Sequence, residues 1–295
     1  MTIGRVFSST VQKVMTKKDR SYLQTLKVAH EPIVMLTCYD FPTAVLQEQA
    51  GVDVIFVGDS VGTNLLGYTS EREVTVDDMV HHLRAVRRAV SDAYLLVDMP
   101  FESFETADLA LRNARRLLDE GADGVKLEGG QERAAVVRAL TDTGIDVCGH
   151  IGFTPQTLGS KGRVQGKSFE QAKVLLQSAL TLQDAGALML VLELVTEDLS
   201  RLISERLRIP TIGIGSGRFC DGQVLVITDV LGISPFTRKI AKRYQEYQGL
   251  TLEAIRRYSD EVRNHLFPTE DNAFPTNPED LARAEDWLRV SQEPS

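Results

Sequence analysis

Eight short apolar segments rich in β-branched residues recur along the chain and alternate with stretches whose apolar residues lie three and four apart. Such strands, apolar almost throughout, are typical of a parallel sheet that helices cover. This alternation limits the fold to the α/β class. The strands are expected at residues 33–36, 52–57, 94–97, 124–127, 145–148, 188–192, 210–214 and 224–227.

Four of the joints between a helix and the next strand have the same form, with a glycine directly before an apolar residue. We expect Gly51, Gly121, Gly144 and Gly186 to adopt the left-handed conformation that ends a helix. Repetition of one joint indicates a repeated βα unit, and eight strands then favour a closed (β/α)8 TIM barrel. A doubly wound open sheet is the alternative, although no Gly-x-Gly-x-x-Gly follows the first strand.

The barrel is expected to occupy residues 31–268, including a helix over 250–267. An N-terminal helical segment over residues 1–30 precedes it, with a solvated helix near residues 10–18. An acidic C-terminal tail over residues 269–295 follows it. The predicted fold is therefore a TIM barrel with an N-terminal helix and a C-terminal helical extension.

Composition excludes several classes of protein. With 33 basic and 41 acidic residues the net charge is −8, which does not fit a nucleic-acid-binding surface. No apolar run reaches the length of a transmembrane helix, so no membrane partner is expected. Cys38, Cys148 and Cys220 are widely spaced and form no Cys-x-x-Cys pair. They predict reduced thiols and a cytoplasmic protein.

Polar residues close most of the apolar segments. In a barrel of this type the carboxyl ends of the strands form the active-site face, so these side chains should meet there. Acids on several different strands are hard to explain as independent surface residues. The residues concerned are Asp40, Asp59, Asp98, Glu128, His150 and Glu193.

The alternation of side chains along a strand predicts which of them face the barrel interior. Val57 should share a side with Asp59, Leu96 with Asp98, and Val191 with Glu193. Lys126 and Glu128 should both point inward, while Val125 and Leu127 face the helices. His150 should face inward with Cys148, where we expect it to donate a hydrogen bond to a substrate.

A cluster of carboxylates at one mouth requires compensation. Two carboxylates about 4 Å apart repel each other by roughly 4 kcal/mol at an effective dielectric of 20. Lys126 can neutralise one, and the others invite a divalent cation. An all-oxygen ligand set favours Mg²⁺, whereas zinc is disfavoured because His150 is the only histidine expected near the mouth.

A magnesium ion with few protein ligands leaves positions open for a 2-oxo acid, whose neighbouring C–H it would acidify. A further carboxylate outside the metal shell could then act as the base, and Glu193 fits by position. The residues thus predict metal-assisted proton abstraction next to a carbonyl, followed by making or breaking a C–C bond. They do not identify the electrophile.

Several strings resemble the ketopantoate hydroxymethyltransferase family, and they occur in order between about residues 31 and 270. The resemblance implies a Mg²⁺-dependent barrel enzyme of pantothenate biosynthesis that forms a homodecamer. It would move a hydroxymethyl group from 5,10-methylenetetrahydrofolate to 3-methyl-2-oxobutanoate through a Mg-stabilised enolate, giving 2-dehydropantoate and tetrahydrofolate. The matching strings are Val57–Ser60, Val97–Phe101, Val125–Gly130, Cys148–Gln156, Val191–Glu193, Ile212–Gly217 and Asp221–Gln223.

The same resemblance implies roles for individual residues. Asp59, Asp98 and Glu128 correspond to the metal positions. Asp59, Ser60, Asp98 and Lys126 correspond to the contacts with the oxo acid. Glu193 corresponds to the proton acceptor.

Two other functions remain open. A Mg²⁺-dependent C–C lyase of the phosphoenolpyruvate and isocitrate barrel group also uses bound oxo acids and a Cys-Gly-His string, although Cys148 lies within an apolar strand. A non-catalytic barrel could instead bind an anion at the Gly213–Gly217 loop, and it would not need the inward carboxylates.

Overall fold

A computed structural model describes residues 17–159, 162–234 and 238–291. The described chain divides into two compact units, one ending at Gln245 and the other beginning at Glu246. Eight parallel strands of the first unit close into a barrel in which each strand pairs with its sequence neighbour and β8 pairs with β1. The strands are β1 (Ile33–Thr37), β2 (Val54–Val57), β3 (Tyr94–Asp98), β4 (Gly124–Glu128), β5 (Asp146–Gly152), β6 (Met189–Glu193), β7 (Thr211–Ile214) and β8 (Gly222–Leu225).

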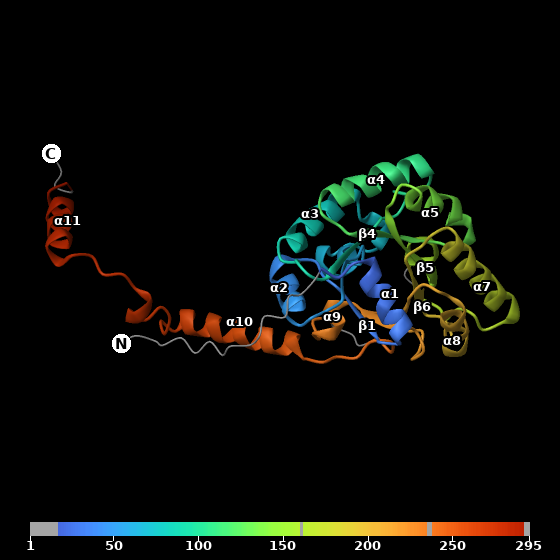
Figure 1. The fold of residues 1–295 in the computed structure, drawn as a ribbon. Helices are drawn as coiled ribbons and strands as arrows, with labels where there is room; N and C mark the ends of the chain where they lie inside the picture. Colours follow the sequence, from blue (N-terminus) through green and yellow to red (C-terminus); the bar gives the residue numbers. More distant parts are fainter. Residues whose placement is uncertain (1–16, 160–161, 235–237, 292–295) are drawn as a thin grey trace. The chain divides into compact units, whose positions relative to one another are not determined.

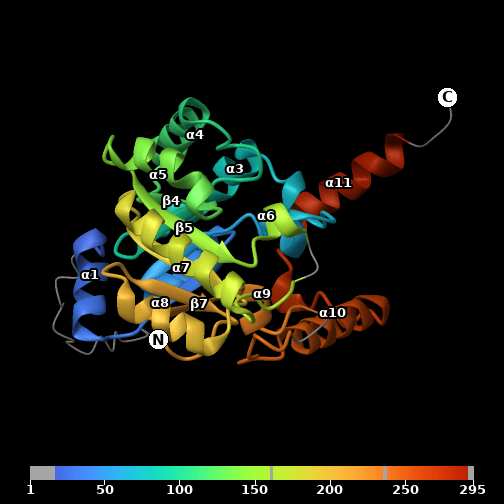
Figure 2. The same cartoon turned by 90° about the vertical axis from the view of Figure 1, so that its right-hand side faces the viewer.

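Helices surround this barrel (Figures 1 and 2). The expected (β/α)8 fold is therefore confirmed, and the open sheet is excluded. All eight expected strands are present, although the last was placed too late, because α9 already begins at Ile227. The helices of this unit are α1 (Arg20–Ala29), α2 (Phe41–Gln49), α3 (Val76–Arg87), α4 (Ala107–Asp119), α5 (Ala134–Thr141), α6 (Pro155–Leu158), α7 (Phe169–Asp184), α8 (Glu197–Arg206) and α9 (Ile227–Val230).

The strands separate two apolar layers. One layer lies between strands and helices and includes Val125 and Leu127. The other fills the barrel interior, where Leu96, Cys148 and Val191 pack together. This division follows from the alternation of side chains along each strand.

The four glycine joints have the expected conformation. Gly51, Gly121, Gly144 and Gly186 all have positive φ, between 77° and 96°. A side chain at Gly121 or Gly186 would also meet a neighbouring helix side chain. The repeated joint thus sets each strand directly after the preceding helix.

Helix α1 closes the amino-terminal end of the barrel. Leu23 and Leu26 are buried among the interior side chains. Lys18 pairs with Asp53 at 2.8 Å, and Lys27 pairs with Asp221 at 2.7 Å. The helix expected near residues 10–18 lies mostly outside the described residues, and residues 17–19 are not helical.

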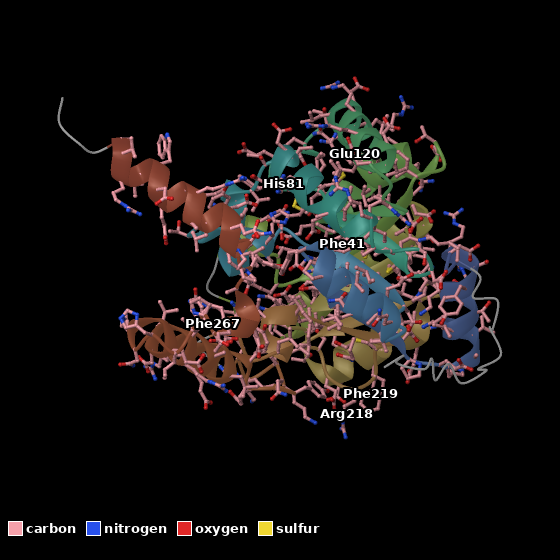
Figure 3. The ribbon with its side chains drawn as sticks, turned by 90° about the vertical axis from the view of Figure 1, so that its left-hand side faces the viewer. Phe41, His81, Glu120, Arg218, Phe219 and Phe267 are labelled. Carbon is pink, nitrogen blue, oxygen red and sulfur yellow. The ribbon has the colours of Figure 1, made fainter. Side chains whose placement is uncertain are left out.

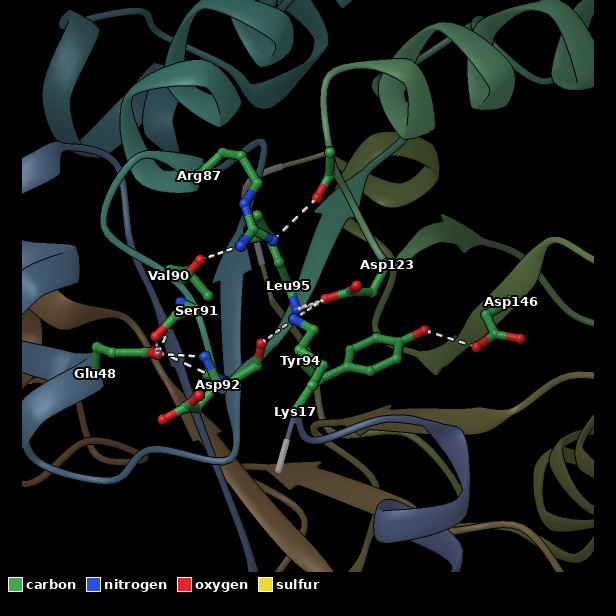
Figure 4. A network of polar contacts seen from close by, with 12 residues as sticks. Lys17, Glu48, Arg87, Val90, Ser91, Asp92, Tyr94, Leu95, Asp123 and Asp146 are labelled. Atoms are coloured by element: carbon green, nitrogen blue, oxygen red, sulfur yellow. Dashed lines mark hydrogen bonds and ion pairs between the residues drawn. The ribbon is translucent and has the colours of Figure 1, made fainter. Parts of the chain in front are cut away.

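Acidic side chains also hold the loops that enter the strands at this end (Figure 4). Asp123 accepts a hydrogen bond from the Leu95 amide at 2.7 Å and pairs with Lys17 at 2.5 Å. The Tyr94 hydroxyl donates to Asp146 at 3.1 Å. This end of the barrel is therefore occupied by structural polar contacts, which leaves the opposite end for chemistry.

The second unit contains α10 (Tyr247–Arg263), a short 3-10 turn (Glu270–Asn272) and α11 (Pro278–Ser291). The helix expected over 250–267 corresponds to α10, and α11 forms within the acidic tail. Within the described residues, no helix is long and apolar enough to cross a membrane.

Candidate active site

A cavity opens at the carboxyl ends of the strands, and it gathers side chains from β2, β3, β4, β5 and β6 or the residues just after them. All seven site residues expected from the sequence line this one cavity. They are Asp59, Ser60, Asp98, Lys126, Glu128, His150 and Glu193.

Asp98 and Lys126 form the central ion pair of this cavity. They are partners in the register of β3 and β4, so both side chains enter the barrel at the same level. The Lys126 ammonium donates to Asp98 Oδ1 at 2.5 Å, and both side chains are buried. Burial alone would lower the pKa of Lys126. The negative charges of Asp98, Asp59 and Glu128 raise this pKa by more than burial lowers it, so the ammonium stays charged. It also lies 5.0 Å from the centre of the Phe56 ring, a favourable cation–π distance.

Asp59 lies beside this pair, just beyond the end of β2. Its backbone amide donates to Asp98 Oδ2 at 3.0 Å. Burial is the main cause that raises the pKa of the Asp59 carboxyl; Asp98 and Glu128 raise it further, and Lys126 offsets only part of this. Burial beside other acids therefore disfavours the charged form of Asp59 unless a further cation joins Lys126.

Gln156, at the start of α6, joins two of the acids. Its side-chain amide donates to Asp59 Oδ2 at 2.7 Å and to the Met99 carbonyl at 3.1 Å. Its backbone amide donates to Glu128 Oε2 at 3.0 Å. No role for Gln156 was predicted from the sequence. The available signal was its position directly after Pro155, because proline favours the first turn of a helix, where backbone amides are free to donate.

His150 lies between two carboxylates. Glu128 and His150 are register partners in β4 and β5, and Oε1 of Glu128 is 3.4 Å from His150 Nδ1. Oε2 of Glu193 is 3.3 Å from Nε2. Neither ring nitrogen makes an aligned hydrogen bond with the described protein atoms. Burial and Lys126 lower the pKa of His150, but Glu128 and Glu193 outweigh them and raise it to about 9.

Ser60 completes the wall next to Asp59. Its hydroxyl is 2.9 Å from the hydroxyl of the buried Tyr39. Directly after it, Gly62–Leu66 form a π-helical turn, a rare conformation that is frequent at functional sites. The segment after β2 is thus shaped by both a hydrogen bond and an unusual helix.

Backbone contacts hold the segment after β6 in place. The Ser216 hydroxyl donates to the Leu192 carbonyl at 2.6 Å and accepts from the Val195 amide at 3.0 Å. Leu194, between them, has a positive φ of 51°, which is uncommon for a residue with a side chain. The Gly213–Gly217 loop therefore supports the backbone around Glu193.

Some expectations about side chains were wrong. Val57 packs in the outer layer, whereas its neighbour Phe56 faces the interior. The alternation could not be extended to Asp59, because β2 ends at Val57 and the chain turns at Gly58. Asp40 does not line the cavity; it caps α2 by accepting from the Thr43 amide at 2.8 Å.

Other polar and sulfur-containing residues lie away from this cavity. Cys148 lies in the barrel interior and does not line the cavity. His81 is exposed on α3 (Figure 3). His82 is buried and lies 2.7 Å from the Tyr39 carbonyl through Nδ1. A catalytic role for Cys148 in the lyase alternative therefore has no support in the geometry.

The acids are held by protein donors rather than preset around a metal. Within the described ranges, no group of three His, Cys, Asp or Glu side chains is arranged to hold a metal ion. Lys126 and the Asp59 amide occupy the two oxygens of Asp98. Magnesium commonly binds one or two carboxylates and keeps several waters, so the all-oxygen donors fit this ion without a three-acid cage.

This fold and site define an α/β-barrel enzyme whose active site lies at the carboxyl ends of the strands. Residues 17–270 match the sequence profile of ketopantoate hydroxymethyltransferase. The chain is 49% identical over 249 residues to the 3-methyl-2-oxobutanoate hydroxymethyltransferase of Pseudothermotoga lettingae, covering 83% of this chain and 94% of that protein. It is 47% identical over 273 residues to the Acetivibrio thermocellus protein of the same name, covering 91% and 93%. The chain belongs to the ketopantoate hydroxymethyltransferase family.

Solved structures share the fold at low sequence identity. A phosphonopyruvate hydrolase in complex with oxalate and Mg²⁺ matches with a TM-score of 0.59 and 12% identity, covering 93% of this chain and 98% of that one. A 2,3-dimethylmalate lyase of the PEP mutase/isocitrate lyase superfamily matches with a TM-score of 0.54 and 15% identity, covering 92% and 97%. At this identity the likeness shows the fold alone.

Proposed function

We propose that this enzyme transfers a hydroxymethyl group from 5,10-methylenetetrahydrofolate to 3-methyl-2-oxobutanoate, giving 2-dehydropantoate and tetrahydrofolate. The observation that carries the proposal is the gathering of seven acidic, basic and hydroxyl side chains in one cavity of a chain that belongs to this family. The cavity is lined by six acidic side chains and by two permanent cations, Lys126 and Arg238, so a further cation would be needed to balance an anionic oxo acid.

The cation is proposed to be Mg²⁺, held by Asp59 and Asp98, with Glu128 binding directly or through water. Oxygen donors in a buried site with excess negative charge support this choice. When bound, the ion would polarise the keto oxygen and make the adjacent C–H more acidic. Gln156 would keep Asp59 and Glu128 oriented through its two amide groups.

The oxo acid is proposed to lie against Lys126 and Ser60. The buried ammonium would offset the substrate carboxylate, and its fixed contact with Asp98 means that little reorganisation is needed. The Ser60 hydroxyl would donate to a substrate oxygen while it remains in contact with Tyr39. His150 would donate from the β5 side.

Glu193 is proposed to take the proton from C3 of the oxo acid. Its side chain keeps 18% of its surface exposed to the cavity, whereas Glu128 is almost fully buried. The electron pair left at C3 would form the new C–C bond to the one-carbon unit of the folate. Both C–N bonds from that carbon to the folate would break, and water would supply the hydroxyl oxygen. The two folate nitrogens would take up the C3 proton and one proton of the water. His150 would hold the Glu193 carboxylate in position from 3.3 Å.

A transfer assay tests this proposal against the lyase alternative. Purified protein with Mg²⁺, 3-methyl-2-oxobutanoate and methylenetetrahydrofolate should form 2-dehydropantoate, and Glu193→Gln should lower kcat about 10²- to 10⁴-fold with KM nearly unchanged. Cleavage of oxaloacetate or isocitrate without folate transfer would instead support the lyase. Retention of more than about a tenth of the rate in Glu193→Gln would show that another group is the base.

Assembly into a homodecamer and a cytoplasmic location are further parts of the proposal. Both come from the family resemblance, and the location also agrees with three free cysteines in the described chain. Sedimentation of the purified protein would test the assembly.

A further inference from the structure

A carboxylate without a protein partner lies on another wall of the same cavity. Asp229 belongs to α9, directly after β8, and only 7% of its surface is exposed. It lines the cavity together with Asp59 and Lys126. In the described part of the chain, the Asp229 side chain makes no hydrogen bond or ion pair. It has no role in the proposed reaction.

The position of Asp229 is fixed by the contacts of its neighbours. The Ile227 amide donates to Thr37 Oγ1 at 2.9 Å, and the Thr228 hydroxyl donates to Asn64 Oδ1 at 3.0 Å. These bonds tie α9 to β1 and to the π-helical turn after β2. The Asp229 oxygens are not among the fully enclosed unpaired atoms of the described residues, so they are accessible from the cavity. A carboxylate held rigidly there without protein donors is suited to a ligand that brings its own donors.

The charges on the cavity wall restrict what that ligand can be. The oxo acid is an anion, and a second carboxylate would repel it, so Asp229 would disfavour its binding on this wall. The proposed magnesium ion is assigned to Asp59 and Asp98, and the cavity is lined by the cations Lys126 and Arg238 as well as by acids. The Asp229 carboxylate can therefore accept hydrogen bonds from a neutral ligand group that carries N–H donors.

The one-carbon donor of the proposed reaction carries such a group. The pyrimidinone ring of a reduced pterin presents an exocyclic amino group and an adjacent ring N–H side by side. Two parallel donors match the two oxygens of a carboxylate, as in the pairing of a guanidinium with a carboxylate. We propose that Asp229 binds this edge of the pterin, an inference that rests on the proposed function.

Asp229→Asn tests the inference, because it keeps the size of the side chain and replaces one acceptor oxygen by a donor. Glu71→Gln is the matched control. Glu71 lines the same cavity, but it already accepts a hydrogen bond from Thr63 at 2.9 Å. The binding of tetrahydrofolate to each purified protein is measured by titration calorimetry. Asp229→Asn should weaken it about tenfold or more, and Glu71→Gln should leave it within about twofold.

A second probe does not depend on a variant that folds. The 2-desamino analogue of tetrahydrofolate lacks the exocyclic amino group, so wild-type protein should bind it about tenfold more weakly than tetrahydrofolate. In Asp229→Asn the two ligands should bind with similar affinity. Equal affinity of the wild type for both ligands would overturn the assignment.

Exchange of the C3 proton of 3-methyl-2-oxobutanoate in D₂O, measured without folate, separates this inference from the proposed function. Asp229→Asn should retain the exchange rate, because the oxo acid site does not include it. Loss of exchange in this variant would place Asp229 with the oxo acid and overturn the inference. If wild-type protein binds tetrahydrofolate and Asp229→Asn binds it equally well, the inference alone fails. If wild-type protein does not bind tetrahydrofolate, the proposed folate reaction fails with it.

Discussion

Replacement of Lys126 by Met should both destabilise the protein and weaken binding of the oxo acid. The Lys126 ammonium lies 2.5 Å from Asp98, and 6% and 2% of the two side chains are exposed. At an effective dielectric of 20 their attraction is about 7 kcal/mol, most of which offsets the cost of taking the two charges out of water. Removing only the lysine leaves Asp98 buried without its partner, which typically costs roughly 3–5 kcal/mol.

Chemical denaturation in urea measures the loss of unfolding free energy, and calorimetry measures binding of 3-methyl-2-oxobutanoate. Lys18→Met is the control, because it breaks a Lys–Asp pair at the opposite end of the barrel. It should leave oxo acid binding unchanged. Added Mg²⁺ should stabilise Lys126→Met more than wild type, since the cation would compensate the buried acids that have lost the lysine. A loss below about 1 kcal/mol, with oxo acid binding intact, would refute the central role of this ion pair.

Three further predictions concern other positions. Gly152→Ala should destabilise the protein by about 2 kcal/mol or more and reduce activity, because Gly152 has a φ of 102° and a Cβ there would overlap the Glu193 carbonyl. Gly144→Ala is the control: the residue has a similar φ with open space around it, so this variant should lose stability but keep its kcat. Equal effects of the two variants on kcat would contradict this prediction. Gln156→Leu should weaken Mg²⁺ affinity about tenfold, measured by calorimetry, because it removes the donor to Asp59; unchanged affinity would contradict it. Burial raises the pKa of the Cys148 thiol to about 12, so little thiolate forms at pH 8 and alkylation of Cys148 should be slow until urea unfolds the chain. Fast labelling of Cys148 in the folded protein would contradict this prediction.

The periodicity of the sequence predicted the barrel and much of the site. Asp98 closes β3 and Lys126 lies two residues before the end of β4, so the alternation of side chains was enough to place both at the mouth. Glu193 closes β6 in the same way. Alternation failed for Asp59. This residue lines the cavity because the chain turns after β2 at Gly58, and the alternation of strand side chains does not extend through a turn.

Other features of the site depend on contacts between distant segments. Gln156 contacts both Asp59, 97 residues earlier in the chain, and Glu128, 28 residues earlier, and its neighbours in the chain do not reveal this. Asp229 was not predicted as a site residue, because only the folded cavity brings this acid of the short helix α9 together with the other acids. Helix α1 buries Leu23 and Leu26 inside the barrel, although its sequence reads as a polar surface helix.

The most direct test of the account is the exchange of the C3 proton of 3-methyl-2-oxobutanoate in D₂O, followed by NMR in the absence of folate. The account predicts exchange that requires Mg²⁺ and is lost in Asp98→Asn, because the acids around Lys126 hold the ion that activates the substrate. Exchange that proceeds equally well in metal-free protein, or in Asp98→Asn, would contradict it.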